Sequence, residues 1–150
     1  MKISPIGAKL ICASEGYRDK AYLCEAGVWT IGYGTTVYPN GIPVKKGDIC
    51  TMPQALEWFY NDITPKEKVL NNKVSVPLTQ NEYDALLSLM YNIGEPRFLT
   101  STLLKLLNQN KKDLAAKEFL KWNKVKGKVS SGLSKRRMSE MTLFLAKNTQ

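Results

Sequence analysis

The residues best suited to chemistry lie between positions 15 and 36. Glu15 stands where a helical pattern stops, and a short run rich in glycine and aromatic residues follows, with Cys24 and Thr30 spaced through it. The negative end of a helix dipole disfavours a charged carboxylate, so a glutamate in the last turn tends to keep its proton. A protonated carboxylic acid is what general acid catalysis needs. The alternative is a solvated glutamate at a helix end, and position alone does not exclude it.

An N-terminal helix is expected to position Glu15. Ser4 followed by Pro5 is typical of a helix start, because the hydroxyl can cap the first turn and the fixed φ of proline suits it. Apolar residues then recur at helical spacing, and Gly16 favours a stop. The pattern predicts a helix that ends beside Glu15.

The next part of the chain is predicted to form a small antiparallel sheet of three strands. Its β-rich runs cover residues 21–23, 28–31 and 36–38, and glycines and a Pro-Asn-Gly turn separate them. Gly32 and Gly34 would let a ligand or another backbone approach closely, or they only shape turns.

Helical patterns fill the remainder. A helix is expected from Pro53, with Thr64-Pro65 as a second start, so one long helix would be kinked or split there. Thr79 or Asn81 would cap the next helix, which ends near Gly94 and has apolar residues on more than one face, as in a central buried helix. Further helices are predicted from Thr100 or Ser101, over 113–122 with Leu114, Phe119 and Leu120 inward, and over 133–146 after a loop at 124–131. The fold class is therefore α+β, with a sheet lobe over about 1–52 and a helical lobe over about 53–150.

The composition of the chain indicates which kinds of partner and which kinds of site to expect. The chain of 150 residues fits one globular domain, and its net charge of +9 favours a polyanionic partner such as nucleic acid, an anionic membrane face or an acidic wall polymer. No apolar run is long enough to span a membrane, and the N-terminus does not have the pattern of a signal peptide. Histidine is absent and the three cysteines lack metal-ligand spacing, so neither a metal nor a cofactor is expected.

Five ordered motifs carry a resemblance to a known family. Glu15-Gly16, Tyr22 and GVWTIGYG at 27–34 are followed by LTQNEYDAL at 78–86, YNIG at 91–94, Phe98 with STLL at 101–104, and Gly132-Leu133 with Arg136-Arg137. Together they resemble the phage-type lysozymes, the muramidase endolysins of tailed bacteriophages in glycoside hydrolase family 24. The family signature is a Glu, eight residues, an Asp or Cys, five residues and a Thr, which Glu15, Cys24 and Thr30 meet. The resemblance covers essentially the whole chain.

The resemblance implies hydrolysis, with inversion, of the β-1,4 bond between N-acetylmuramic acid and N-acetylglucosamine in peptidoglycan. Glu15 would be the general acid, and Cys24 and Thr30 would position the water that attacks the sugar. By the same resemblance, Thr36, Tyr91 and Ser101 are candidates to line the glycan cleft.

The resemblance also implies a biological setting. We expect a monomer that binds peptidoglycan glycan strands and no nucleic acid, without stable membrane insertion. It would stay in the host cytoplasm until lysis and then reach the periplasm and cell wall through a holin-type pore. Its positive charge would help it hold the anionic wall or lipopolysaccharide.

Cys24 departs from most of the family, in which an aspartate stands at this position. A neutral thiol is a poor base, and the neighbouring Glu25 and Asp19 are expected to raise its pKa rather than lower it. A disulfide from Cys24 to Cys12 or Cys50 would occlude the site, although a reducing cytoplasm favours three free thiols.

Thr35 and the pair Arg136-Arg137 also lead to predictions. Thr35 stands where the family often has a histidine, so a structural ion pair would be missing and local stability would suffer. Arg136 or Arg137 could reach Glu15 as an ion-pair partner, but a solvated basic face is the simpler interpretation of both.

Three alternatives remain open. A lytic transglycosylase uses one acid and no positioned water, and a wall-binding relative would be inactive because Cys24 replaces the aspartate. A nucleic-acid-binding module would explain the basic clusters between Lys105 and Lys128, but not Glu15 or the glycine-rich strands.

Overall fold

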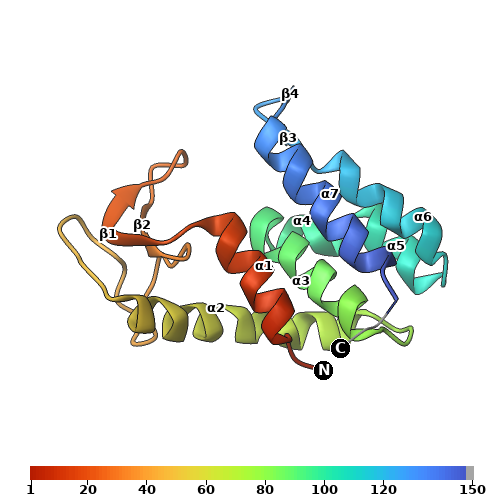
Figure 1. Cartoon of the computed structure of the whole chain (residues 1–150), viewed down its shortest axis with the longest axis horizontal. Helices are drawn as coiled ribbons and strands as arrows, with labels where there is room; N and C mark the ends of the chain where they lie inside the picture. Colours follow the sequence, from red (N-terminus) through yellow and green to blue (C-terminus); the bar gives the residue numbers. More distant parts are fainter. Residues whose placement is uncertain (148–150) are drawn as a thin grey trace. The chain divides into compact units, whose positions relative to one another are not determined.

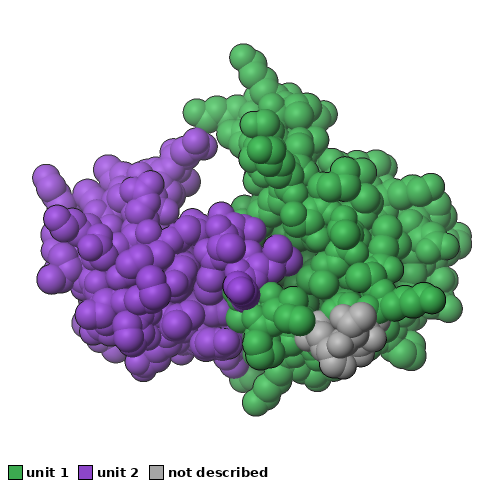
Figure 2. Space-filling view, in the orientation of Figure 1, with its two compact units in different colours: residues 1–8, 66–150 green, residues 9–65 purple. Residues whose placement is uncertain are grey.

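The computed structural model describes residues 1–147, which form two compact units. Unit 2 comprises residues 9–65, and unit 1 joins residues 1–8 to the chain from residue 66 onward (Figure 2). Two helices labelled in Figure 1, α1 (Pro5–Glu15) and α2 (Met52–Lys73), have residues in both units. The division into a sheet lobe over about 1–52 and a helical lobe over about 53–150 stays a prediction; the first half of α2 is grouped with the sheet in unit 2.

The sheet of unit 2 has two strands, β1 (Arg18–Leu23) and β2 (Trp29–Gly32). They pair antiparallel with Tyr22 opposite Thr30 and Leu23 opposite Trp29, and a bulge interrupts the register towards Arg18. The expected class, α+β with a small antiparallel sheet, is confirmed.

The prediction of a third strand at 36–38 is wrong. Among the described residues, this segment contributes a single isolated bridge between Val37 and Pro43. The chain turns back at once: the Tyr38 amide donates to the carbonyl of Ile42 at 2.9 Å, and Gly41 adopts a φ of +86°. The segment therefore pairs with its own continuation rather than with β2.

A close approach holds β2 against α2. A Cβ atom at Gly32 would lie 3.0 Å from the Cβ of Ala55, and Gly32 has a φ of +65°, which favours glycine. On either side of this contact, Ile31 and Phe59 are fully buried. The expectation that Gly32 permits a close backbone approach is confirmed, and the neighbour is a helix.

A hydrogen bond reinforces that contact where an ion pair was expected to be missing. The hydroxyl of Thr35 donates to the carboxylate of Asp62 on α2 at 2.7 Å, and Thr35 is buried. Hydrogen bonds to a charged acceptor are stronger than neutral ones, so the threonine keeps a link between the sheet segment and the helix.

Pro65 lies inside α2, which the structure shows as one continuous helix. Proline cannot donate to the carbonyl four residues earlier. The hydroxyl of the preceding Thr64 donates to the carbonyl of Tyr60 at 2.8 Å. The helix therefore continues through the second start that the sequence suggested.

Unit 1 is helical, and its central helix is α3 (Gln80–Ile93). Thr79 caps this helix in a capping box with Glu82, and all ten residues from Asn81 to Met90 are buried, as expected for a central helix. The N-terminus of α1 joins the same unit, because the Ser4 amide donates to the Asp84 carboxylate at 3.1 Å. The other elements are α4 (Glu95–Leu99), α5 (Thr102–Asn108), α6 (Lys112–Glu118), a 3₁₀ turn η1 (Phe119–Lys121), β3 (Lys124–Val125), β4 (Lys128–Val129) and α7 (Ser131–Leu145).

Two expectations for unit 1 need correction. The helix predicted over 113–122 ends as the 3₁₀ turn η1, and Leu114 is exposed rather than inward. The segment expected as a loop contains the hairpin β3–β4, whose turn places Lys126 and Gly127 at positive φ. Strands of two residues lie below what a sequence pattern can indicate.

The last helix carries buried charge. α7 packs along α3 (Figure 1), and Glu140 on α7 is fully buried with Nε of Arg137 2.7 Å from its Oε1. The hydroxyl of Ser88 on α3 donates to the same carboxylate, and Nε of Arg136 lies 3.3 Å from it. The expected solvated basic face is therefore wrong for Arg136 and Arg137, whose guanidinium groups are buried around Glu140.

The described residues contain no helix that combines the length and apolar content needed to cross a bilayer.

We predict that Glu140→Gln lowers the free energy of unfolding by about 3–5 kcal/mol, because it leaves the buried Arg137 without the facing carboxylate charge. Urea unfolding followed by circular dichroism measures this change. Lys121→Gln is the control: the Lys121 side chain is 72% exposed although its partner Glu118, 2.6 Å away, is buried, so this change should cost only about 1 kcal/mol. Equal effects of the two changes would contradict the prediction.

We also predict that Gly32→Ala destabilises the protein more than Gly47→Ala. Both glycines have positive φ, so each change costs about 1–2 kcal/mol of backbone strain, but nothing lies within 4 Å of a Cβ atom at Gly47. Crowding against Ala55 should add about 1–3 kcal/mol at Gly32. Thermal unfolding of the two variants measures the difference, and equal losses would show that α2 yields to the new methyl group.

Candidate active site

The first candidate residue, Glu15, is the last residue of α1. The helix stops there because Gly16 adopts a φ of +76° while its amide still donates to the carbonyl of Cys12 at 2.9 Å. Glu15 is half-buried. The predicted helix start at Ser4, its stop at Gly16 and the position of Glu15 in the last turn are all confirmed.

Cys24 lies directly after β1, in the tight turn that leads to β2. Its amide donates to the carbonyl of Val28 at 3.1 Å, and the amide of Gly27, at a φ of +77°, donates back to the carbonyl of Cys24 at 2.9 Å. These two bonds fix the backbone of the turn around Cys24.

Backbone N–H groups change the acidity of Cys24. Hydrogen bonds from the backbone of Val28 and then of Ala26 lower the pKa of the Cys24 thiol below its ordinary value, against a smaller opposing effect of burial. The expectation that Glu25 and Asp19 would raise this pKa is wrong, because donors aimed at the sulfur dominate. A thiolate stabilised by N–H donors is a better base than an ordinary thiol.

Thr30 lies on β2 and is 5% exposed. Its hydroxyl donates to the carbonyl of Val28 at 3.0 Å, the same carbonyl that accepts from the Cys24 amide at 3.1 Å. A hydroxyl has one proton and two lone pairs, so Thr30 can hold Val28 and still accept a hydrogen bond. The structure thus brings Cys24 and Thr30 together and places Glu15 in the same unit.

Cys12 and Cys50 differ from Cys24. Burial, and then the charge of Glu15, raise the pKa of Cys12 to about 11, which supports the expected position of Cys12 near Glu15 on the helix. Burial also raises the pKa of Cys50, and the Cys50 thiol donates to the carbonyl of Arg18 at 3.6 Å. All three cysteines are free in the structure, and the hypothesis of a regulatory disulfide stays a prediction.

The candidates for glycan binding have different surroundings. Thr36 is exposed in unit 2, while Tyr91 and Ser101 belong to unit 1. Lys66 lies 5.7 Å from the centre of the Tyr91 ring. Ser101 is buried and caps α5, because its hydroxyl accepts from the amide of Leu104 at 3.1 Å and donates to the carbonyl of Phe98 at 2.7 Å. The role of these three residues in substrate binding stays a prediction, as does a contact of Arg136 or Arg137 with Glu15.

The sequence did not single out Tyr38 and Trp58, whose rings pack with centres 4.8 Å apart beside a cavity in unit 2. The tyrosine stands next to the turn at 39–41, and the tryptophan lies within the apolar helix stretch ALEWFY at 55–60, where an aromatic residue is ordinary. Within residues 1–147, no group of three or more His, Cys, Asp or Glu is arranged to hold a metal ion.

Comparisons with known proteins place the chain in a family. The family model described as phage lysozyme matches residues 12–140. The chain is 48% identical over 148 residues to the endolysin of Acyrthosiphon pisum secondary endosymbiont phage 1, covering 96% of this chain and 98% of that protein. It is 40% identical to the endolysin of Bacillus phage PZA, covering 96% of this chain but only 55% of that longer protein.

A solved structure extends this similarity to the fold. The endolysin from Escherichia coli O157:H7 phage FAHEc1 superposes with a TM-score of 0.89 at 40% identity, covering 97% of this chain and 94% of that one. A match over most of the sequence, joined by the same fold at substantial identity, leads to one conclusion: the chain belongs to the phage lysozyme family.

Proposed function

We propose that Glu15 protonates the glycosidic oxygen of peptidoglycan while Cys24 and Thr30 position the water that attacks the sugar. As a phage lysozyme, the chain is a peptidoglycan-hydrolysing endolysin. The bond cleaved is the β-1,4 link between N-acetylmuramic acid and N-acetylglucosamine. Because a glycosidic oxygen leaves poorly unless it is protonated, the reaction needs one acid for that oxygen and one acceptor for the proton of the attacking water.

The observation that carries the proposal is the shared acceptor that holds Cys24 and Thr30 together: the Cys24 amide and the Thr30 hydroxyl both donate to the carbonyl of Val28, at 3.1 and 3.0 Å. The backbone N–H groups of Val28 and Ala26 favour the thiolate, and the Thr30 hydroxyl lies beside it. A thiolate can accept a proton from water, and the hydroxyl can orient the water by accepting a second hydrogen bond. The pair therefore supplies the acceptors that the missing aspartate would supply.

The remaining parts of the proposal follow from family membership. Thr36, Tyr91 and Ser101 contact the glycan, the chain acts as a monomer, and nucleic acid is no ligand. The enzyme accumulates in the host cytoplasm, and a holin-type pore admits it to the periplasm at lysis. Its net charge of +9 favours retention at the anionic wall.

Two alternatives share the fold. A lytic transglycosylase would leave 1,6-anhydro ends, and an inactive wall-binding relative would release no product. The lowered pKa of Cys24 favours hydrolysis, because it supports a held water that neither alternative uses.

The first test is a turbidity assay on purified sacculi, with products identified by mass spectrometry. Glu15→Gln should slow clearing by about 10²- to 10⁴-fold, because the amide cannot donate the proton to the leaving oxygen. Glu57→Gln, a change at an exposed position of α2, is the control and should leave clearing intact. Products with reducing ends support hydrolysis, whereas 1,6-anhydro ends or full activity of Glu15→Gln would refute the proposal.

The second test concerns the ionised form of Cys24. Because its pKa is lowered, the clearing rate should rise with pH through a value below that of an ordinary thiol. Cys24→Ser keeps a hydrogen-bonding group but does not ionise, so this limb of the pH profile should vanish and the rate should fall. Cys24→Asp should retain activity and shift the limb to acidic pH. A profile that is the same in the wild type and Cys24→Ser would mean that the sulfur does not act as the base.

The third test compares the thiols directly. With a pKa of about 11, Cys12 is thiolate in only about one molecule in a thousand at pH 8, whereas Cys24 is thiolate more often than an ordinary cysteine. A short pulse of iodoacetamide at pH 8, followed by peptide mass spectrometry, should therefore label Cys24 first. Protein unfolded in guanidinium is the control, in which all three thiols should react alike. Faster labelling of Cys12 would contradict the electrostatic argument, and a mass difference on reduction would reveal a disulfide.

A further inference from the structure

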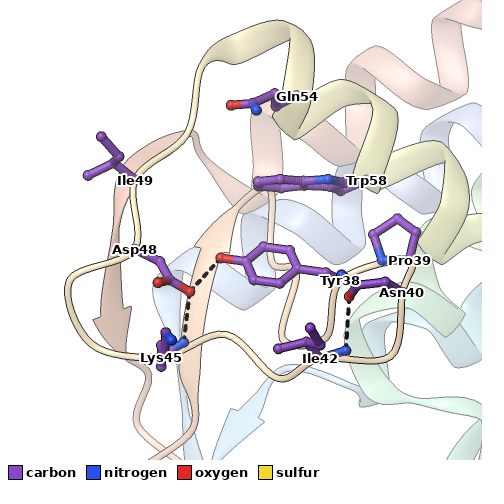
Figure 3. A pocket seen from close by; sticks show the side chains of 9 residues that line it. All are labelled: Tyr38, Pro39, Asn40, Ile42, Lys45, Asp48, Ile49, Gln54 and Trp58. Atoms are coloured by element: carbon purple, nitrogen blue, oxygen red, sulfur yellow. Dashed lines mark hydrogen bonds between the residues drawn. The ribbon is translucent and has the colours of Figure 1, made fainter.

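Unit 2 contains a cavity of about 510 Å³ that none of the candidate catalytic residues lines. It lies beside the first turns of α2 and the loop that follows Tyr38, entirely within residues 38–58 (Figure 3). Its size falls within the roughly 300–1,000 Å³ of sites for small molecules. The cavity is therefore large enough for a ligand of its own.

Two aromatic rings border the cavity. The rings of Tyr38 and Trp58 are tilted by 57° with their centres 4.8 Å apart (Figure 3). The hydroxyl of Tyr38 donates to the carboxylate of Asp48 at 2.7 Å, and burial followed by this bond raises the pKa of Tyr38 to about 12. The same bond lowers the pKa of Asp48, so Tyr38 stays protonated and Asp48 stays charged at neutral pH. The rings are held in place around an apolar surface.

Polar groups with defined orientations lie beside these rings. The amide oxygen of Asn40 accepts from the amide of Ile42 at 3.0 Å, and the amide oxygen of Gln54 accepts from the amide of Thr51 at 2.9 Å. Because a side-chain amide is planar, its NH₂ group then points away from the bonded oxygen. Both residues line the cavity, where each NH₂ group can donate to a ligand.

Charge complements these donors. Oδ2 of Asp48 accepts from Tyr38 and from the backbone of Lys45 at 3.1 Å, so its other oxygen can accept a hydrogen bond from a ligand. One carboxylate and one ammonium group line the cavity, and their charges offset each other. A neutral ligand fits this balance better than a phosphate or another strong anion.

A neutral molecule with an apolar face, several hydroxyl groups and an acetamido group matches this surface. Its C–H face can pack on Tyr38 or Trp58, its carbonyl and hydroxyl oxygens can accept from Asn40 and Gln54, and one hydroxyl can donate to Asp48. These are the groups of an N-acetylhexosamine.

We propose that this cavity is a second, non-catalytic glycan site that binds an N-acetylhexosamine residue of the wall polymer. The choice of glycan rests on the proposed function, since peptidoglycan is the polymer on which the chain acts. A second contact on the same polymer raises the effective concentration of glycan at the catalytic residues without taking part in the reaction. It therefore strengthens binding to long strands more than to short fragments.

The first experiment locates the binding of a short probe. Tri-N-acetylchitotriose is titrated into ¹⁵N-labelled Glu15→Gln protein, in which turnover is suppressed, and ¹H–¹⁵N spectra are recorded. The indole signal of Trp58 and the side-chain amide signal of Gln54 should shift together and saturably. The indole of Trp29, next to Thr30, reports separately on the catalytic turn. Shifts at Trp29 without shifts at Trp58 would overturn the proposal.

The second experiment measures binding of the same protein to intact sacculi by sedimentation. Gln54→Glu keeps the oxygen that accepts from Thr51 and removes the NH₂ donor, and it should weaken binding by about fivefold or more. Asn61→Asp, an equal change of charge at an exposed position of α2 outside the cavity, is its control. Trp58→Leu should weaken binding similarly, and Tyr60→Leu, at an exposed aromatic residue of the same helix, should not. Equal effects of each variant and its control would refute the proposal.

The outcomes separate this proposal from the catalytic one. If protein with Glu15 intact clears sacculi but the cavity variants bind as their controls do, only the second site fails. If nothing is cleared but Trp58 shifts on titration, the catalytic proposal fails and the second site stands. A peptide stem that shifts Trp58 when the trisaccharide does not would replace glycan with peptide and overturn the proposal.

Discussion

The contact between β2 and α2 at Gly32 is the constraint on which the rest of unit 2 depends. Gly32 adopts a φ of +65°, which favours glycine, and a Cβ atom there would lie only 3.0 Å from the Cβ of Ala55. Beside that contact, Ile31 and Phe59 are fully buried and the hydroxyl of Thr35 donates to the carboxylate of Asp62. Because Thr30 lies two residues before Gly32 on the same strand, the candidate catalytic turn is anchored to the helix through this strand.

The turn between β1 and β2 explains how a cysteine can stand where most of the family has an aspartate. A carboxylate is charged at neutral pH in almost any setting, whereas a thiol needs N–H donors to favour its anion. The tight turn, with Gly27 at positive φ, supplies them from the backbone of Val28 and Ala26. Backbone donors do not depend on neighbouring side chains, which is why Glu25 and Asp19 do not decide the acidity of Cys24.

Unit 1 contains charged side chains that are buried in its interior. The carboxylate of Glu140 is surrounded by Arg136, Arg137 and the Ser88 hydroxyl, so α7 and α3 are joined by hydrogen bonds as well as by apolar packing. Removing one member of such a cluster costs more stability than removing one member of an apolar pair, because a buried charge is left without its partner. The cluster therefore favours one arrangement of α7 on α3.

The sequence by itself determined the elements whose signals are local. Ser4-Pro5 and Gly16 bound the first helix, and Thr79 and Glu82 form the capping box, because capping chemistry depends on neighbours along the chain. Five ordered motifs, among them Glu15, Cys24 and Thr30 at the family spacing, carried the resemblance to the family. Only the tertiary structure decided the acidity of Cys24, the burial of Arg137 and the cavity beside Trp58. Each of these depends on atoms that folding brings together or on the direction of backbone N–H groups in a turn, which residue types and their spacing do not specify.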